Sequence, residues 1–165
     1  MTAVLQVDWL AYQTLIEQVA IAIQQSDWRP QQVLAIARGG LYLGDALSRI
    51  LQVPLAVMAV QSYGGEAGRD RGAVQIGANI AMTSDRLLSP LLLVDDLVDS
   101  GETLQQTRVW LQQTQKVMEL RTAVLWQKPS SQFQPDFVAQ VLTDNPWIEQ
   151  PFETYDRWGR RPGHP

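Results

Sequence analysis

The sequence predicts an α/β fold in which a mostly parallel sheet carries helices on both faces. Two observations support this prediction. Short apolar runs alternate along the chain with segments whose apolar residues recur at helical spacing. These runs are almost uniformly apolar, as expected of strands that are buried on both faces of a parallel sheet. A chain of 165 residues without an evident repeat or linker is expected to form a single domain over residues 1–165.

The first sixty residues are predicted to supply two helices and two strands. Asp8 is a suitable N-cap for a helix over residues 9–25, because its carboxylate can accept a hydrogen bond from the first turn. A second helix is expected over residues 41–51. Short apolar runs at 33–37 and 54–60 predict the strands.

Residues 61–82 are predicted to form a flexible hood. The stretch 61–73 is rich in glycine and in charged residues, and is too polar to pack against a core. We therefore expect a mobile loop there. Residues 74–82 are expected to form a strand beside it.

The second half of the chain is predicted to add three strands and one helix. Leu91–Val94 is the clearest buried strand, because all four of its residues are apolar. A helix is expected over 102–116, with strands over 120–126 and 137–142. Residues 155–165 are rich in arginine, glycine and proline and are expected to be irregular.

The composition argues against several classes of site and partner. The chain has no cysteine, so it has no disulfide and no thiolate metal site. One histidine, His164, is too few for a His-rich metal site, and its place beside the last residue argues against a Ser-His-Asp triad. A net charge of −4 argues against nucleic acid as a partner, because sequence-independent binding needs a basic field. No apolar run approaches the ~20 residues of a membrane span, and no signal peptide is evident. A cytoplasmic protein without an integral membrane segment is expected.

Residues 94–103 combine acidic side chains with the features of a phosphate site. Asp95 and Asp96 follow the buried strand, and a turn that contains Asp99 and Gly101 leads into the next helix. Backbone N–H groups of such a turn bind anions, and glycine allows a close approach. Three carboxylates beside a phosphate need a cation or a sugar diol between them. The segment therefore predicts a phosphorylated sugar as ligand, with Mg²⁺ as cofactor.

This segment resembles the phosphoribosyl pyrophosphate (PRPP) motif of type I phosphoribosyltransferases. That motif has two apolar strand residues, two acids, a short apolar step and then Asp-Thr/Ser-Gly-x-Thr. Arg38-Gly39-Gly40 resembles the family's pyrophosphate loop, which often contains a non-proline cis peptide. Asp8-Trp9, Lys128-Pro129 and Trp147-Ile148-Glu149-Gln150-Pro151 together resemble the bacterial xanthine–guanine phosphoribosyltransferases. The similarity extends over roughly residues 6–153.

The resemblance implies a role for each matching residue of the PRPP half. Asp95 and Asp96 would contact the ribose hydroxyls and hold Mg²⁺, directly or through water. Asp99 would also be the catalytic carboxylate that manages the purine proton at N7. Arg69 matches the hood arginine near pyrophosphate, with Arg71 as an equal rival. The PRPP site is thereby expected to comprise Arg38, Gly39, Arg69, Asp95, Asp96, Asp99, Ser100, Gly101, Glu102 and Thr103.

The resemblance assigns the purine to a base-binding hood over residues 128–153. Lys128 would donate to the 6-oxo group, and because lysine has only donors this disfavours adenine. Trp147 would stack on the base, the carbonyl of Ile148 would meet the 2-substituent, and Glu149 lies close enough to read that edge. The implied partners are PRPP and a purine base. The implied reaction transfers 5-phosphoribosyl to N9 of guanine, xanthine or hypoxanthine and releases pyrophosphate.

Three other functions remain open on the sequence. The chain could use PRPP with a different base, or it could be a non-catalytic regulator that binds PRPP or a nucleotide. An aspartyl-phosphate enzyme would explain Asp95 or Asp96 at a strand end, but not the phosphate cradle that follows. Glu102 departs from the family pattern, in which glycine or a basic residue is common at that position. A homo-oligomer, either dimer or tetramer, is expected from the resemblance.

Overall fold

The computed structural model describes residues 3–62 and 74–158. Within these residues the main sheet has seven strands in the order β4-β3-β2-β5-β7-β6, and β8 also pairs with β7. All of its pairings are parallel except that of β3 with β4, which confirms the mostly parallel sheet. The strands of the main sheet are β2 (Gln32–Ala37), β3 (Leu55–Ser62), β4 (Val74–Ala81), β5 (Leu91–Val94), β6 (Leu97–Val98), β7 (Leu120–Gln127) and β8 (Phe137–Val141).

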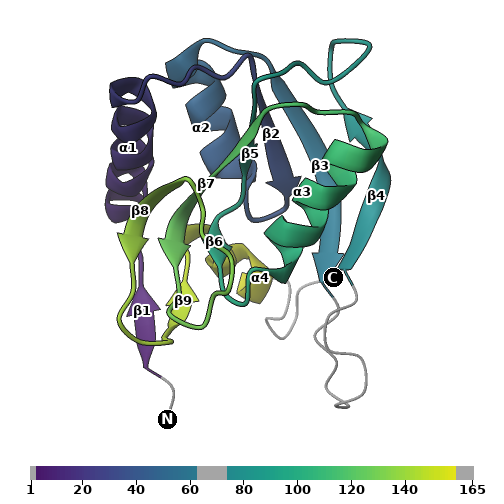
Figure 1. Ribbon diagram of the computed structural model, residues 1–165. Coiled ribbons are helices and arrows are strands. Elements are labelled where there is room, and N and C mark those ends of the chain that lie inside the picture. The colour runs from purple at the N-terminus through teal and green to yellow at the C-terminus, as the bar shows by residue number, and fades with distance from the viewer. Residues whose placement is uncertain (1–2, 63–73, 159–165) are drawn as a thin grey trace.

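Helices cover both faces of the sheet, as predicted (Figure 1). α1 (Trp9–Gln25) and α2 (Leu41–Leu51) pack on one face, and α3 (Glu102–Thr114) packs on the other. Successive residues of a strand point to opposite faces. In β2, Val33 and Ala35 accordingly join the core under α1 and α2, whereas Leu34 and Ile36 join the core under α3. Both cores are apolar, which explains why the strands lack an alternating pattern.

The predicted helix starts and strands are found with small differences at their ends. α1 begins at Trp9, and the Asp8 carboxylate accepts a hydrogen bond from the backbone N–H of Ala11 at 2.8 Å. The helix expected over 102–116 ends at Thr114. No helix in the described part of the chain combines the length and the hydrophobicity that crossing a membrane requires.

The strand pairing places an acid pair at the carboxyl end of β5. Val94, at the end of β5, and Leu97, at the start of β6, pair with β7 in one continuous register. Asp95 and Asp96 lie between them. In open parallel sheets ligands bind outside the carboxyl ends of the strands, so the pair lies where a site is expected.

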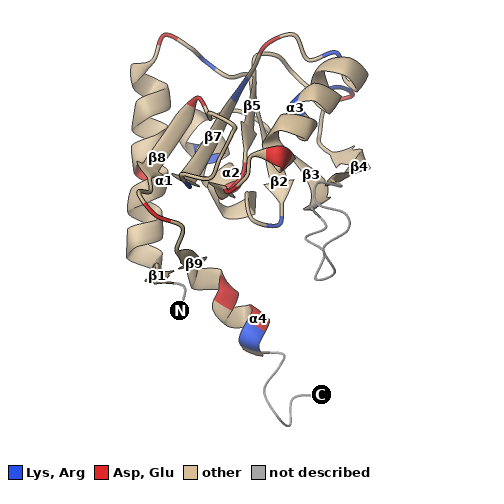
Figure 2. Cartoon of the chain, turned by 60° about the horizontal axis from the view of Figure 1, so that its bottom comes forward, with Lys and Arg blue, Asp and Glu red and all other residues tan. Residues whose placement is uncertain are grey.

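A second, two-stranded parallel sheet is formed by β1 (Val4–Gln6) and β9 (Trp147–Glu149). After it come the 3₁₀ helix η1 (Pro151–Glu153) and α4 (Thr154–Trp158), which carries charges of both signs (Figure 2). Two expectations need correction here. The prediction of an irregular tail is wrong for residues 155–158, which are helical because α4 packs beside η1. Within the hood predicted over 61–82, the loop expected over 61–73 begins too early, since β3 continues to Ser62, whereas the strand expected over 74–82 is found as β4; residues 63–73 and 159–165 lie outside the described residues.

Candidate active site

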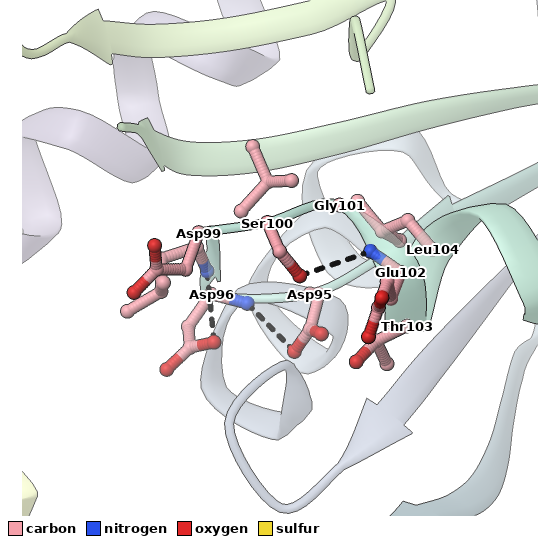
Figure 3. A pocket seen from close by; sticks show the side chains of 10 residues that line it. Asp95, Asp96, Asp99, Ser100, Gly101, Glu102, Thr103 and Leu104 are labelled. Carbon is pink, nitrogen blue, oxygen red and sulfur yellow. Dashed lines mark hydrogen bonds between the residues drawn. The ribbon is translucent and has the colours of Figure 1, made fainter. Parts of the chain in front are cut away.

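A cavity of about 250 Å³ opens at the carboxyl end of β5, and the predicted segment forms its walls (Figure 3). It is lined by the ten residues from Asp95 to Leu104. The segment runs from the end of the strand through β6 and a turn into α3. The structure therefore brings together the Asp95, Asp96, Asp99 and cradle residues that the sequence placed in one site.

The two acids differ in their environment. Asp95 is only 9% exposed, and its Oδ1 accepts the backbone N–H of Asp96 at 3.0 Å. Burial, followed by the negative charge of Asp96, holds the pKa of Asp95 well above its usual value. Asp96 Oδ1 accepts the backbone N–H of Leu97 at 2.8 Å, and its Oδ2 accepts a hydrogen bond from the Gln150 side-chain amide.

The Arg38 loop lies against this acid pair. A Cβ on Gly39 would lie 2.6 Å from the carboxyl carbon of Asp96, so a side chain at this position would force that carboxylate to move. The peptide bond between Ala37 and Arg38 is cis, as the resemblance to the pyrophosphate loop implied. The Arg38 guanidinium is 86% exposed and lies 3.7 Å from the carboxylate of Asp156, an acid on α4. Beside the loop is a second cavity of about 550 Å³, lined by Ala37 and Arg38 and by residues of β3 and β4.

The turn into α3 depends on Gly101. This residue is the N-cap of α3 and has a φ of +92°, in the left-handed region that favours glycine. The Oγ of Ser100 accepts the backbone N–H of Glu102 at 3.3 Å, and Phe133 packs beneath the turn. The Glu102 side chain is exposed in the first helical turn, where an acid is favourable. The unusual acid in the cradle is thus compatible with the helix start.

Asp99 and Lys128 form an ion pair. The sequence assigned them separately, Asp99 to the PRPP half of the site and Lys128 to the base-binding hood. Lys128 Nζ lies 2.9 Å from Asp99 Oδ2, and the lysine is only 11% exposed whereas Asp99 is 58% exposed. Ser130 donates to Asp99 Oδ1 at 2.9 Å and also lies 3.1 Å from Asn145 Oδ1. Partial burial acts to raise the pKa of Asp99, but the hydrogen bonds from Lys128 and Ser130 and the lysine charge together lower it.

The residues expected to bind the base follow on β9. Trp147 is 60% exposed and its neighbour Ile148 is buried, as alternation along a strand requires. The Glu149 carboxylate does not face solvent freely, because it pairs with Arg157 of α4 and accepts a hydrogen bond from Gln6 at 3.3 Å. The pairing of β9 with β1 fixes the alternation of these three side chains, and the ion pair with Arg157 of α4 orients Glu149.

Sequence reasoning missed several residues of this site. Ser130, Gln150, Gln6 and Arg157 contact expected site residues, but none of them carried a local pattern that could have identified it. Gln150 lay within the run 147–151 that carries the resemblance. Its role needed the fold, which brings it to Asp96 from 54 positions away. Arg69 and its rival Arg71 lie outside the described residues.

The described residues contain no group of three or more His, Cys, Asp or Glu side chains that could hold a metal ion by themselves. Asp95 and Asp96 supply two adjacent carboxylates. Mg²⁺ is commonly bound by one or two carboxylates together with substrate phosphates and water. A cation would also relieve the repulsion that contributes to the raised pKa of Asp95. The acid pair therefore fits a Mg²⁺ that arrives with a phosphorylated ligand.

A family model described as "Phosphoribosyl transferase domain" matches residues 8–157. The xanthine-guanine phosphoribosyltransferase of Idiomarina loihiensis is 30% identical over 125 residues, which are 74% of this chain and 71% of that protein. The protein of the same name from Vibrio vulnificus strain YJ016 is 29% identical over 150 residues, 89% of this chain and 87% of its own length.

Solved structures agree with this fold. The purine phosphoribosyltransferase of Pyrococcus horikoshii Ot3 is 25% identical and superposes with a TM-score of 0.73, covering 90% of this chain and 93% of that one. The Helicobacter pylori xanthine-guanine-hypoxanthine phosphoribosyltransferase is 22% identical, with a TM-score of 0.76 and coverage of 96% and 99%. Both pairs of chains share the arrangement of the sheet and its helices over nearly their whole lengths.

Proposed function

The chain belongs to the phosphoribosyl transferase domain family and is a purine phosphoribosyltransferase, and on that premise we propose that it transfers 5-phosphoribosyl from PRPP to N9 of a 6-oxopurine in purine salvage. The purine would be guanine, xanthine or hypoxanthine, and the products the nucleoside monophosphate and pyrophosphate. One observation carries the choice of base. The half-exposed Asp99 carboxylate is paired with the almost buried Lys128 ammonium next to the sugar-phosphate cavity.

The cavity of the acid pair would hold the sugar phosphate. Hydroxyls of ribose donate to carboxylates, so Asp95 and Asp96 suit the 2′ and 3′ positions. The N-terminal turn of α3 suits the 5′-phosphate, because its N–H groups and the helix dipole favour an anion. Ser100 and Thr103 would add hydroxyl donors from the cavity wall. The cradle is supported by its position at the end of β5 and by the close approach that Gly101 allows.

Asp95 and Asp96 would also hold Mg²⁺ with the pyrophosphate of PRPP. When bound, the ion neutralises charge on the leaving group. The Gly39 backbone lies beside Asp96, and together with the neighbouring Arg38 it is suited to the same pyrophosphate. We retain Arg69 as a further pyrophosphate ligand on the strength of the resemblance alone.

The purine would lie between Lys128, Asp99 and Trp147. Lysine can only donate, so Lys128 would select a 6-oxo group over a 6-amino group. A carboxylate within hydrogen-bond reach of N7 can accept the purine proton, and the lowered pKa keeps Asp99 ionised for that task. The exposed face of Trp147 is available for stacking, while the Ile148 carbonyl and Glu149 would meet the 2-substituent.

Catalysis would be mostly positioning and electrostatics. As pyrophosphate leaves, positive charge would develop at C1 of the ribose, and carboxylates that bind the ribose hydroxyls would stabilise that charge. Asp99 would hold the purine with N9 directed at C1. No covalent nucleophile from the protein is required.

The proposal is tested by nucleotide formation from PRPP, Mg²⁺ and each of guanine, xanthine, hypoxanthine, adenine and uracil. We expect product from 6-oxopurines only, and a fall of about 10²-fold or more in kcat/KM for Asp99→Asn, the range typical of general acid–base groups. Asp45→Asn is the matched control, because Asp45 is exposed on α2, away from the acid pair, and forms an ion pair with Arg49. PRPP binding without product from any base would favour a regulator instead.

A further inference from the structure

Gln150 is a buried amide in direct contact with an acid that the sequence assigned to the sugar. Its side chain is 4% exposed, it follows β9 directly, and its Nε2 donates to Asp96 Oδ2. We propose that Gln150 is a positioning residue that fixes the Asp96 carboxylate in the orientation that binds PRPP. This inference rests on the proposed role of the acid pair.

The Asp96 carboxylate is held from three sides. The backbone N–H of Leu97 binds Oδ1 at 2.8 Å, and Gln150 binds Oδ2. Gly39 forms the third wall, since a Cβ there would lie 2.6–2.7 Å from all three carboxyl atoms. A carboxylate has about four lone-pair sites, and one hydrogen bond on each oxygen leaves the others free for a ligand. Without the Gln150 donor the carboxylate could rotate about its remaining hydrogen bond.

Among the described residues, Leu97 and Gln150 are the hydrogen-bond donors to the Asp96 carboxylate, and the wall behind the acids supplies none. Tyr12 is 1% exposed and packs against Phe152 and Trp126, with ring centroids 5.9 and 6.0 Å away. Its hydroxyl is buried without a hydrogen-bond partner in the described part of the chain. Burial, and then the charges of Asp96 and Asp95, raise the pKa of Tyr12, which indicates a poorly solvated wall.

The other end of the Gln150 amide argues against a purely structural role. Its Oε1 is buried without a hydrogen-bond partner among the described residues. A buried unpaired acceptor destabilises a fold, and an apolar side chain of similar size would avoid that penalty. Gln150 is also the N-cap of η1, where its backbone N–H donates to Glu153 Oε1 at 3.4 Å in a capping box. The test must therefore separate the orientation of Asp96 from the stability of this helix start.

The position of Gln150 also links the two halves of the site. Trp147, Ile148 and Glu149, which would bind the base, form β9 and immediately precede Gln150. The placement of β9 therefore sets the orientation of an acid that contacts the sugar. Loss of Gln150 should weaken the binding of PRPP and leave the binding of the purine unchanged, because its hydrogen bond goes to Asp96, which would contact the ribose.

Gln32 provides a matched control for the substitution to leucine. It is also fully buried, its Oε1 accepts the backbone N–H of Leu88 at 2.8 Å, and its Nε2 has no partner in the described residues. It lies at the first residue of β2, at the opposite end of the sheet from the acid pair. Gln150→Leu and Gln32→Leu thus each remove one buried side-chain hydrogen bond and one unpaired atom, and Gln150→Leu also removes the N-cap side chain of η1.

The test compares the KM for PRPP, the KM for the purine and the thermal midpoint of both variants with the wild type. For Gln150→Leu we expect the KM for PRPP to rise about tenfold, the effect of one hydrogen bond to a charged group, with the KM for the purine unchanged. Gln32→Leu should leave both constants unchanged. An unaltered PRPP constant in Gln150→Leu, or an equal loss in both variants, would overturn the inference.

If Gln150→Leu folds poorly, a second variant tests the same hydrogen bond. Gln150→Glu keeps the shape of the side chain but replaces the donor with a carboxylate that faces Asp96. We expect calorimetry to show weaker binding of Mg²⁺–PRPP. Binding as tight as in the wild type would refute the role of the donor. If the wild-type protein itself neither binds nor uses PRPP, the proposed function fails, and that result is distinguishable from failure of this inference.

Discussion

Replacing Gly101 by alanine tests whether the phosphate cradle depends on one backbone geometry. Gly101 has a φ of +92°, which an L-residue with a Cβ rarely adopts. The added Cβ would lie 2.4 Å from the Cβ of Phe133 and 2.9 Å from its backbone nitrogen. Both atoms are fixed by the Phe133 backbone, so no change of side-chain rotamer can relieve the overlap. Either the turn or the segment around Phe133 must move.

The expected loss of stability has two parts. The left-handed conformation costs about 1–2 kcal/mol once a Cβ is present, and overpacking a buried contact adds about 1–3 kcal/mol. We therefore expect the free energy of unfolding to fall by about 2–5 kcal/mol. At roughly 2–4 °C per kcal/mol for a chain of this size, the Tm should drop by about 10 °C.

Urea and thermal unfolding would measure this loss, and calorimetry would measure the binding of Mg²⁺–PRPP. Binding should weaken together with stability, because Gly101 lines the cavity and begins α3. Gly77→Ala in β4 is the control: a Cβ there would lie 3.0 Å from the Ala59 carbonyl oxygen, a tight contact but a smaller overlap, and Gly77 has no left-handed φ to strain. A Gly101→Ala protein with the Tm and PRPP affinity of the wild type would refute the reasoning.

Two further substitutions test the polar contacts of the site. Ser130→Ala removes a hydrogen bond that lowers the pKa of Asp99, so that pKa should rise and the acidic limb of kcat/KM for the purine should move to higher pH. Ser131→Ala, whose hydroxyl bonds to the Phe133 backbone, should leave the limb in place, and a limb unmoved in Ser130→Ala would contradict the assignment. Tyr12→Phe removes a buried hydroxyl that has no partner within the described residues, so the free energy of unfolding in urea should stay the same or rise by about 1 kcal/mol. A clear loss of stability would show that the hydroxyl is engaged in the folded protein.

Local features of the chain were predictable because their causes are local. Continuous apolar runs identified β2, β5 and β7, and the helical spacing after Asp8 identified α1. The cavity at the end of β5 was predictable for the same reason, since the acids, the turn and the helix start that line it lie within ten consecutive residues. Short elements gave no such signal. β1 has three residues, too few to show a period, and it exists because β9 pairs with it.

By itself the sequence determined the class of fold, the cradle at the end of β5 and the family to which the chain is similar. Only the tertiary structure decided which distant side chains meet there. It pairs Lys128 with Asp99, seats Gly39 against Asp96 and brings Gln150 to the same carboxylate. The physical reason is that periodicity and turn chemistry act over a few residues, whereas these contacts depend on the order and register of strands that are far apart along the chain.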